Sequence, residues 1–196
     1  MKVSIHNNIK SFNKDLQKFK RVDIPNVTRI ALNDTAKRIQ ELEKVSIKKS
    51  FDKPKPQTIN SVYVIFAKKN KLQATITFRD WAQGFIHRNI VGGVRPVKNT
   101  AVPTVNAKLN QYGNIPGRKS GVVKGKQFKA TVKGTYGVFE RKKDGLKIIH
   151  RFETNPQYQA IYPFYRVAVK AANYIAPLKF EKVANYYIKK AGYKSK

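Results

Sequence analysis

The sequence predicts an α+β fold, in which an antiparallel sheet of about four or more strands is flanked by N-terminal and C-terminal amphipathic helices. Apolar residues recur at helical spacing near both ends of the chain, whereas β-branched and aromatic residues gather in the middle. A long basic, glycine-rich insertion interrupts the strand-forming region. At 196 residues the chain can bury one substantial core, so we expect a single domain over residues 1–196.

Two helices are expected before the first strand. From Val3 to Phe19 the apolar residues recur every three or four positions, which is the stripe of an amphipathic helix. A second helix begins near Asp23 or Asn26, either of which can cap it, and its apolar face extends to Val45. The two prolines of the following "DKPKPQ" end this helix, because each lacks an N–H donor and disfavours helical backbone before it.

Two antiparallel hairpins are expected in the middle of the chain. The segments "SVYVIFA" and "LQATITFRD", separated by the polar "KKNK", predict the first. The segment "TYGVFERKKDGLKIIHRF" predicts the second, with Asp144 and Gly145 as its turn, because Asp-Gly is favoured between antiparallel strands. Together the hairpins supply the four strands of the predicted sheet.

The last predicted element is a helix after Pro163, a residue well suited to a first helical turn. Apolar residues at helical spacing run from Tyr165 to Tyr187. We expect Pro177 to kink or divide this helix.

The basic insertion lies between the hairpins. No Asp or Glu occurs from Trp81 to Phe139, and this stretch holds nine of the eleven glycines. Its periodic apolar signal is weak, apart from possible short strands at "SGVVKG" and "QFKATVKG". We therefore expect residues 91–135 to form an extended basic arm within the domain.

The charge balance indicates a negative partner. The chain has 41 Lys and Arg against 11 Asp and Glu, a formal net charge of +30. Such a chain repels itself unless it meets DNA or an acidic protein surface, and composition alone does not separate these partners. No apolar run approaches the roughly 20 residues of a membrane span, and the N-terminus does not resemble a signal peptide.

Enzyme chemistry finds little support in the sequence. Cysteine is absent, which excludes disulfides and thiolate chemistry. His6, His87 and His150 are far apart and lack metal-ligand spacing, and Asp80 is a lone acid at a strand end, where a turn residue or a partner for Arg79 is expected. We expect no enzymatic activity, catalytic residue, metal site or cofactor.

A second possible contact region is "FRDWAQGFIHRN", which interleaves aromatic and basic residues. Trp81, Arg88, Arg95 and Lys98 are candidates for contact with DNA or an acidic partner. Alternatively, Trp81 and Phe85 cover an edge of the core while the basic side chains are solvated.

Three segments resemble a known family. The helix "IPNVTRIALNDTAKRIQ", the central "LNQYGNIPG" and the ending "YPFYRVAVKAANYIAPLKFEKVANYYIKKA" together resemble the minor tail protein Z group of tailed bacteriophages, which belongs with the tail-completion and head–tail joining proteins. The most specific part is "YGNIP", from Tyr112 to Pro116, which in that group is followed by Arg-Gly and here by Gly117-Arg118.

The resemblance implies a structural virion protein of the tail or neck that passes through the host cytoplasm during assembly. It would form a ring of copies around the DNA channel and bind other neck, connector or tail proteins, and possibly the DNA. In this interpretation the arm docks on neighbours that order it, through these residues: Tyr112, Gly113, Asn114, Pro116, Arg118, Lys119, Lys124, Lys126 and Lys129. The alternative is a free nucleic-acid-binding protein that uses the basic glycine-rich insertion.

Overall fold

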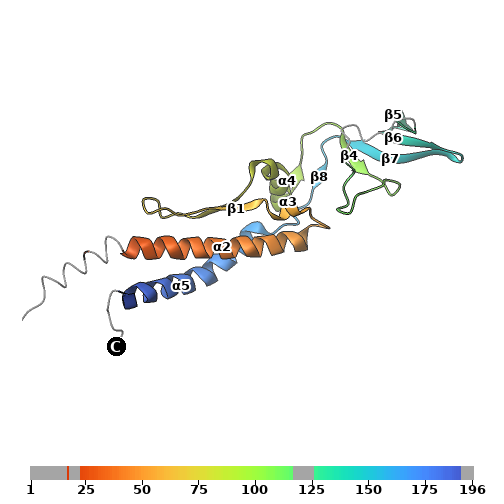
Figure 1. Cartoon of the computed structure of the whole chain (residues 1–196). Helices are drawn as coiled ribbons and strands as arrows, with labels where there is room; N and C mark the ends of the chain where they lie inside the picture. The colour runs from red at the N-terminus through yellow and green to blue at the C-terminus, as the bar shows by residue number, and fades with distance from the viewer. Residues whose placement is uncertain (1–16, 18–22, 117–125, 191–196) are drawn as a thin grey trace, which may run out of the picture. The chain divides into compact units, whose positions relative to one another are not determined.

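A computed structural model of the chain describes residue 17, residues 23–116 and residues 126–190 (Figure 1). It is a mixed α+β structure with antiparallel sheets, which confirms the predicted fold class. The chain divides into two compact units, where the sequence predicted one domain. Unit 1 contains the described residues up to Val45, Val62–Arg79 and the residues from Phe164 onward; unit 2 contains Ser46–Ser61 and Asp80–Pro163. The helix predicted from Val3 to Phe19 lies outside the described residues, except for Gln17, which is helical.

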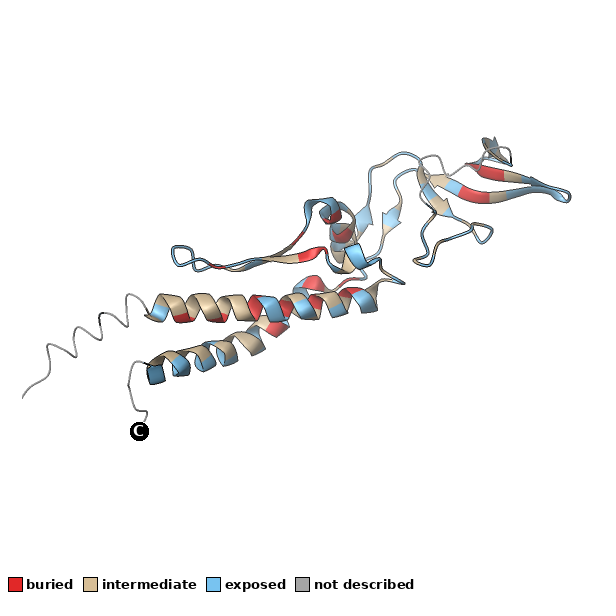
Figure 2. Ribbon diagram, in the orientation of Figure 1, coloured by how far each residue is buried: buried red, intermediate tan, exposed pale blue. Residues whose placement is uncertain are grey.

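The predicted second helix is confirmed as α2 (Ile24–Ser50). Its apolar residues return to one face at helical spacing, and Figure 2 shows buried positions recurring along it. Val27, Ala31 and Ile39 are each less than 5% exposed. This periodic burial explains why the segment is a helix, because the stripe loses contact with water only in that conformation.

The first predicted hairpin is also confirmed, as β1 (Val62–Ile65) and β2 (Thr75–Phe78), which pair with Val62 opposite Phe78. Helix α2 holds it through side-chain amides. The Asn33 side chain accepts from the Ala67 N–H at 2.7 Å and donates to the Ala67 carbonyl at 3.2 Å, and Gln40 Nε2 donates to the Val62 carbonyl at 2.8 Å. These bonds satisfy backbone groups outside the two-stranded ladder.

The predicted C-terminal helix is α5 (Phe164–Lys190), which continues through Pro177 without being divided. It is anchored at its start, where the Phe164 and Phe78 ring centroids lie 4.9 Å apart. Phe164 and Ala171 are its buried residues. Within the described part of the chain, no helix is long and apolar enough to cross a membrane.

Unit 2 contains two helices that the sequence analysis did not predict, α3 (Pro56–Ile59) and α4 (Asp80–Val91). Helix α4 buries Ala82 and Ile86, which are four residues apart on one face. At its other end, the carbonyl of Asn89 accepts from the N–H groups of Ile161 and Tyr162, both at 2.9 Å. The segment before α5 is therefore tied to the last turns of α4.

The strands of unit 2 form two antiparallel sheets. A short pair joins β3 to β8, and a four-stranded sheet has the order β4-β7-β6-β5. The bounds are β3 (Gly93–Val94), β4 (Thr100–Pro103), β5 (Gln127–Val132), β6 (Thr135–Lys142), β7 (Gly145–Glu153) and β8 (Gln157–Tyr158). The strand predicted at "QFKATVKG" is β5, whereas "SGVVKG" falls largely among residues that are not described. Both β4 and β5 lie within residues 91–135, so parts of the predicted arm are edge strands of this sheet.

The second predicted hairpin is confirmed as β6 and β7, but its predicted turn is wrong by one residue. Gly145 is already paired with Lys142, so the turn consists of Lys143 and Asp144. Gly145 has a φ of +118°, a backbone conformation that residues with a Cβ rarely adopt. The glycine is therefore needed at the first residue of β7 rather than inside the turn.

The β6–β7 ladder contains a bulge between Val138 and Phe139. Phe139 pairs with Ile148, whereas Val138 pairs with His150, so β7 has one extra residue at this point. A Cβ at the neighbouring Gly137 would clash with the backbone carbonyl oxygen of His150. The bulge thus explains the glycine inside β6, and it sets which side chains share a face farther along the hairpin.

Candidate interaction surfaces

The "YGNIP" motif begins in a turn closed by its own hydrogen bonds. Asn110 Oδ1 accepts from the backbone N–H of Tyr112 at 2.9 Å and of Asn114 at 3.1 Å. The Asn110 N–H donates to the Asn114 carbonyl, and the Gly113 N–H donates to the Asn110 carbonyl, both at 2.9 Å. Gly113 has a φ of +70°, which explains the glycine at this position. The turn therefore has internal order, beyond the neighbour-dependent order expected from the sequence.

The predicted arm residues are divided between two places. Tyr112 is half-buried, and Gly113, Asn114 and Pro116 are exposed beside the turn. Lys126 is exposed immediately before β5, and Lys129 is exposed within it. Three further predicted contacts lie outside the described residues: Arg118, Lys119 and Lys124.

Helix α4 presents the predicted aromatic and basic residues at intervals of four and three positions. Trp81 is 54% exposed, and its ring lies 6.3 Å from that of Phe85. Arg88 follows one turn later, and its guanidinium donates to the Val94 carbonyl. Slightly more than half of Trp81 is therefore open to contact, while Phe85 is half-buried.

Arg95 and Lys98 lie between β3 and β4, and both side chains are exposed. The backbone here is fixed, because the Arg95 N–H donates to the Pro156 carbonyl at 3.0 Å and the Val97 carbonyl accepts from Asn155 at 3.0 Å. The segment therefore supplies exposed positive charge from a backbone that is held in place.

One face of the four-stranded sheet carries a cluster of two aromatic rings and a lysine, which we call the Tyr136 face. The rings of Tyr136 and Phe152 lie 5.0 Å apart on neighbouring strands. Lys129 Nζ lies 5.6 Å from the centre of the Phe152 ring, in the geometry of a cation–π contact. Tyr136 is 40% exposed, so one aromatic ring of this cluster is open to solvent.

The opposite face carries a similar pair, which we call the Phe128 face. Phe128 stands opposite Phe139, with ring centroids 6.3 Å apart, and the Arg141 guanidinium lies 5.3 Å from the Phe128 ring. Phe139 is 5% exposed, so half of this aromatic pair is buried. Because successive side chains of β6 alternate between faces, Phe139 and Arg141 point away from Tyr136.

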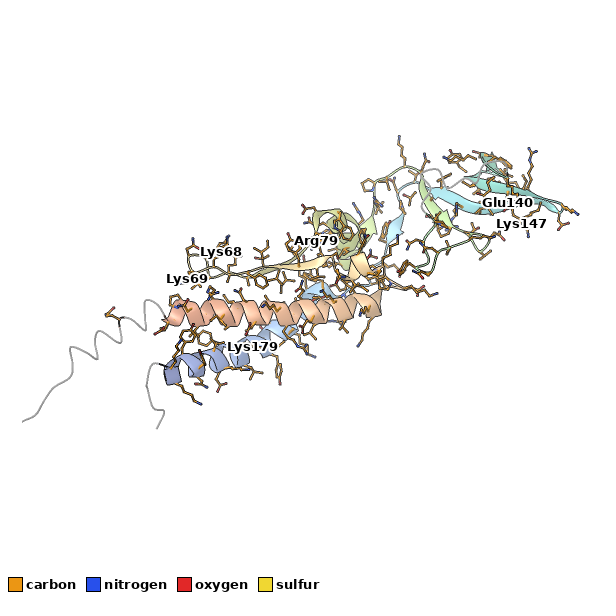
Figure 3. The ribbon with its side chains drawn as sticks, viewed as in Figure 1. Lys68, Lys69, Arg79, Glu140, Lys147 and Lys179 are labelled. Atoms are coloured by element: carbon orange, nitrogen blue, oxygen red, sulfur yellow. The ribbon has the colours of Figure 1, made fainter. Side chains whose placement is uncertain are left out.

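An open groove of about 510 Å³ lies where β5 begins and β6 ends. It is lined by Lys126, Gln127, Phe128, Glu140, Arg141 and Lys142. Glu140 is paired with Lys142 at 3.0 Å, and Figure 3 shows it on the same hairpin as Lys147. The hydrogen bond from Lys142, and then the charges of Lys142 and its basic neighbours, lower the pKa of Glu140. The Glu140 carboxylate is thus already paired with a lysine of the same groove.

His150 lies beneath this sheet surface and is 4% exposed. Burial lowers the pKa of its imidazole, because removing water disfavours the charged form. Within the described parts of the chain, its Nδ1 atom has no hydrogen-bond partner. Such a histidine belongs to the core of the sheet and stays neutral at physiological pH.

Helix α5 exposes a series of large apolar side chains along its whole length. Tyr174 is 74% exposed, and the series consists of Tyr165, Val169, Tyr174, Leu178, Phe180 and Tyr186. The same helix has six basic residues and one acid, Glu181. This surface combines apolar contact area with positive charge.

Comparisons with protein-family models, with curated proteins and with solved structures found no match to this chain. The sequence analysis named residues of this turn and of α4 as candidate contacts but missed the Tyr136 face. A signal for it existed, because a single glycine within a strand pattern, here Gly137, often marks a bulge.

Proposed function

We propose that this chain is a structural virion protein of a tailed bacteriophage, which completes the tail end or neck and joins it to neighbouring ring proteins around the DNA channel. The proposal rests on the resemblance of the three segments quoted above and on the surface of α5. In this role the protein acts by contact alone and carries out no chemistry.

The exposed apolar side chains of α5 are the observation that carries the proposal. Exposed apolar side chains that gather on one element can mark a protein–protein contact site. Covering such side chains is worth roughly 25 cal/mol per Å² of apolar surface. A helix with two buried residues and a series of exposed aromatic and aliphatic ones is suited to contact with another protein.

The charge of α5 restricts that contact. Two copies of α5 meeting each other would bring six basic residues against six, with one acid each. Like charges opposed across an interface are unfavourable. We therefore propose that α5 meets an acidic surface of a neighbouring ring protein rather than α5 of a second copy.

The turn from Asn110 to Asn114 supplies a second docking element. Its hydrogen bonds fix the backbone around Tyr112 before any partner is present. A preformed element loses little conformational freedom on binding. Tyr112 and Pro116 are the proposed anchors, and the lysines near β5 supply attraction to an acidic surface.

The test is incorporation of variants into particles. In a phage that lacks its own copy of the gene, the double variant Tyr174→Ala/Leu178→Ala should fold normally yet assemble few complete particles. The matched control is Leu72→Ala, an exposed apolar residue outside both α5 and residues 91–135. Particle yield by electron microscopy and the folded fraction by circular dichroism are the measurements. Normal particles from the double variant, or a protein that binds DNA tightly at physiological salt and never enters particles, would overturn the proposal.

A further inference from the structure

We infer that the Tyr136 face of the four-stranded sheet binds single-stranded nucleic acid, with the Tyr136 ring stacking on a base and Lys129 and nearby lysines contacting the backbone phosphates. This inference does not require the proposed assembly role, although Lys129 takes part in both. It concerns a surface that the sequence alone did not identify.

The arrangement of the rings is the first support. Tyr136 is 40% exposed and packs against Phe152 at 5.0 Å, so its ring is supported on one side and open to solvent. Exposed aromatic rings on an antiparallel sheet are a common platform for unstacked bases. Each base stacked in this way is worth about 1–3 kcal/mol.

The bulge in β6–β7 creates this platform. From the turn to Phe139 the paired residue numbers follow one register, and beyond the bulge Val138 pairs with His150 and Gly137 with Arg151. The shifted register places Phe152 opposite Tyr136. Without it, Arg151 would stand opposite Tyr136, and Phe152 would point to the other face. The bulge, which gives β7 one residue more than β6 at this point, therefore brings two aromatic rings together.

The charges on this face suit a polyanion. Lys129 is exposed and lies over the Phe152 ring, and Lys142 and Lys147 alternate onto the same face of the hairpin. Glu140 is the acid among these positions, and its charge is matched by Lys142 at 3.0 Å. Lys129 therefore lies beside the ring pair, and Lys142 and Lys147 add positive charge farther along the same face.

A duplex fits this surface less well than a single strand. In a duplex the bases are stacked on each other, so the Tyr136 ring would have no free base to contact, and only the lysines would bind. A single strand can use the ring and the lysines together. The difference between the affinities for the single strand and the duplex thus measures the contribution of base stacking.

The experiment compares the full-length protein with Tyr136→Phe, Tyr136→Leu and Lys129→Ala, using the fluorescence anisotropy of labelled oligothymidine and of a duplex of equal length. Tyr136→Phe should keep the affinity for the single strand. Tyr136→Leu should weaken it about fivefold or more, with little change for the duplex. Lys129→Ala should reduce the slope of log affinity against log salt by about 0.7 for the single strand.

One control variant changes the opposite face of the sheet, and a second control adds a competing polyanion to the solution. Arg141→Ala removes the equivalent cation from the Phe128 ring and should lower the affinity no more than the loss of one surface charge. Each variant is first checked for an unchanged thermal midpoint. The inference is wrong if Tyr136→Leu binds oligothymidine as tightly as the unchanged protein. It is also wrong if that variant loses single strand and duplex equally, or if polyglutamate displaces the single strand at equal charge concentration.

Discussion

Helices α2 and α5 have the same length, 27 residues each, and very different surroundings. Helix α2 buries a regular stripe and contacts the β1–β2 hairpin through Asn33 and Gln40. Helix α5 buries Phe164 and Ala171 and leaves its aromatic side chains in solvent. The difference indicates that α2 is packed by its own chain, whereas α5 has apolar side chains that the described parts of the chain leave uncovered.

The comparison also shows what kind of residue marks each role. The buried stripe of α2 mixes aliphatic side chains with alanines such as Ala31 and Ala36, which allow close packing inside one protein. The exposed series of α5 is rich in tyrosine, including Tyr165, Tyr174 and Tyr186. Tyrosine offers a large apolar ring with a polar tip, so it tolerates water before binding and is enriched at interfaces.

The largest expected effect comes from emptying the α2 stripe. Ile39→Ala should lower the free energy of unfolding by about 2–4 kcal/mol, because Ile39 is 4% exposed and its loss leaves a cavity. Val169→Ala on α5 should change it by less than about 0.5 kcal/mol, because Val169 is 57% exposed. Urea unfolding followed by circular dichroism measures both. Equal losses would break the distinction between the two helices.

The next effect concerns the amide that ties α2 to the hairpin. Asn33→Ala removes both hydrogen bonds to Ala67 and leaves partly buried backbone groups unpaired, which should cost about 1–2 kcal/mol. Asn173→Ala, at an exposed position of α5, is the matched control and should be close to neutral. The thermal unfolding midpoints of the two variants measure both effects on stability. A costly Asn173→Ala would show that α5 is held by its own chain more firmly than its exposure indicates.

A smaller effect is expected from a surface cation. Lys37 on α2 lies 5.5 Å from the centre of the Phe66 ring, and Lys37→Ala should cost about 0.5–1 kcal/mol. Lys170 on α5 is exposed, and Lys170→Ala should leave stability unchanged or raise it slightly by reducing the excess of positive charge. Both effects are measured by urea unfolding at low salt, followed by circular dichroism. If Lys37→Ala leaves the stability unchanged, the cation–π contact does not help to hold α2 to the hairpin.

At neutral pH the smallest expected effect on stability is that of His150. This residue lies in neither helix, and its protonation limits the pH range in which the helix variants can be compared. Its pKa is lowered from 6.5 by burial, so the unfolded chain takes up the proton first as the pH falls. Stability is therefore constant above about pH 6.5 and declines below it, down to the lower pKa of the folded state.

The check is the urea midpoint of the sheet signal across this pH range. His150→Leu should remove the decline, whereas the exposed His87 is the matched control and His87→Leu should retain it. A decline that persists in His150→Leu would assign the pH dependence to other groups.

The sequence predicted the elements whose local pattern is strong and missed those whose pattern is weak. The α2 stripe and the β1–β2 hairpin were predicted because their spacing needs no knowledge of distant residues. Helix α4 was missed because Gly84 and polar residues weaken its pattern, although Ala82 and Ile86 have the right spacing. Strand β4 has no strong pattern of its own, and it exists because β7 offers an edge to pair with.

The candidate surfaces follow the same rule. The turn at Tyr112 could be predicted because glycine and asparagine form turns through local hydrogen bonds. The contact of Tyr136 with Phe152 could not, because it depends on a one-residue register shift that no local pattern specifies. The Asp144-Gly145 turn was misplaced for a related reason. Gly145 is required for its positive φ at the first residue of β7, and it does not lie in the turn.

The parts of α5 before and after Pro177 have different expected rates of local opening. Proline has no N–H, so the carbonyl of Asn173 lacks its usual helical donor, and cooperativity along the helix is weakened there. The first half is fixed by Phe164 and Ala171, which are buried, whereas the second half has no residue in the buried class among those described. Amide hydrogens after Pro177 should therefore exchange with solvent faster than those before it, and slow to the same rate once a partner covers the helix.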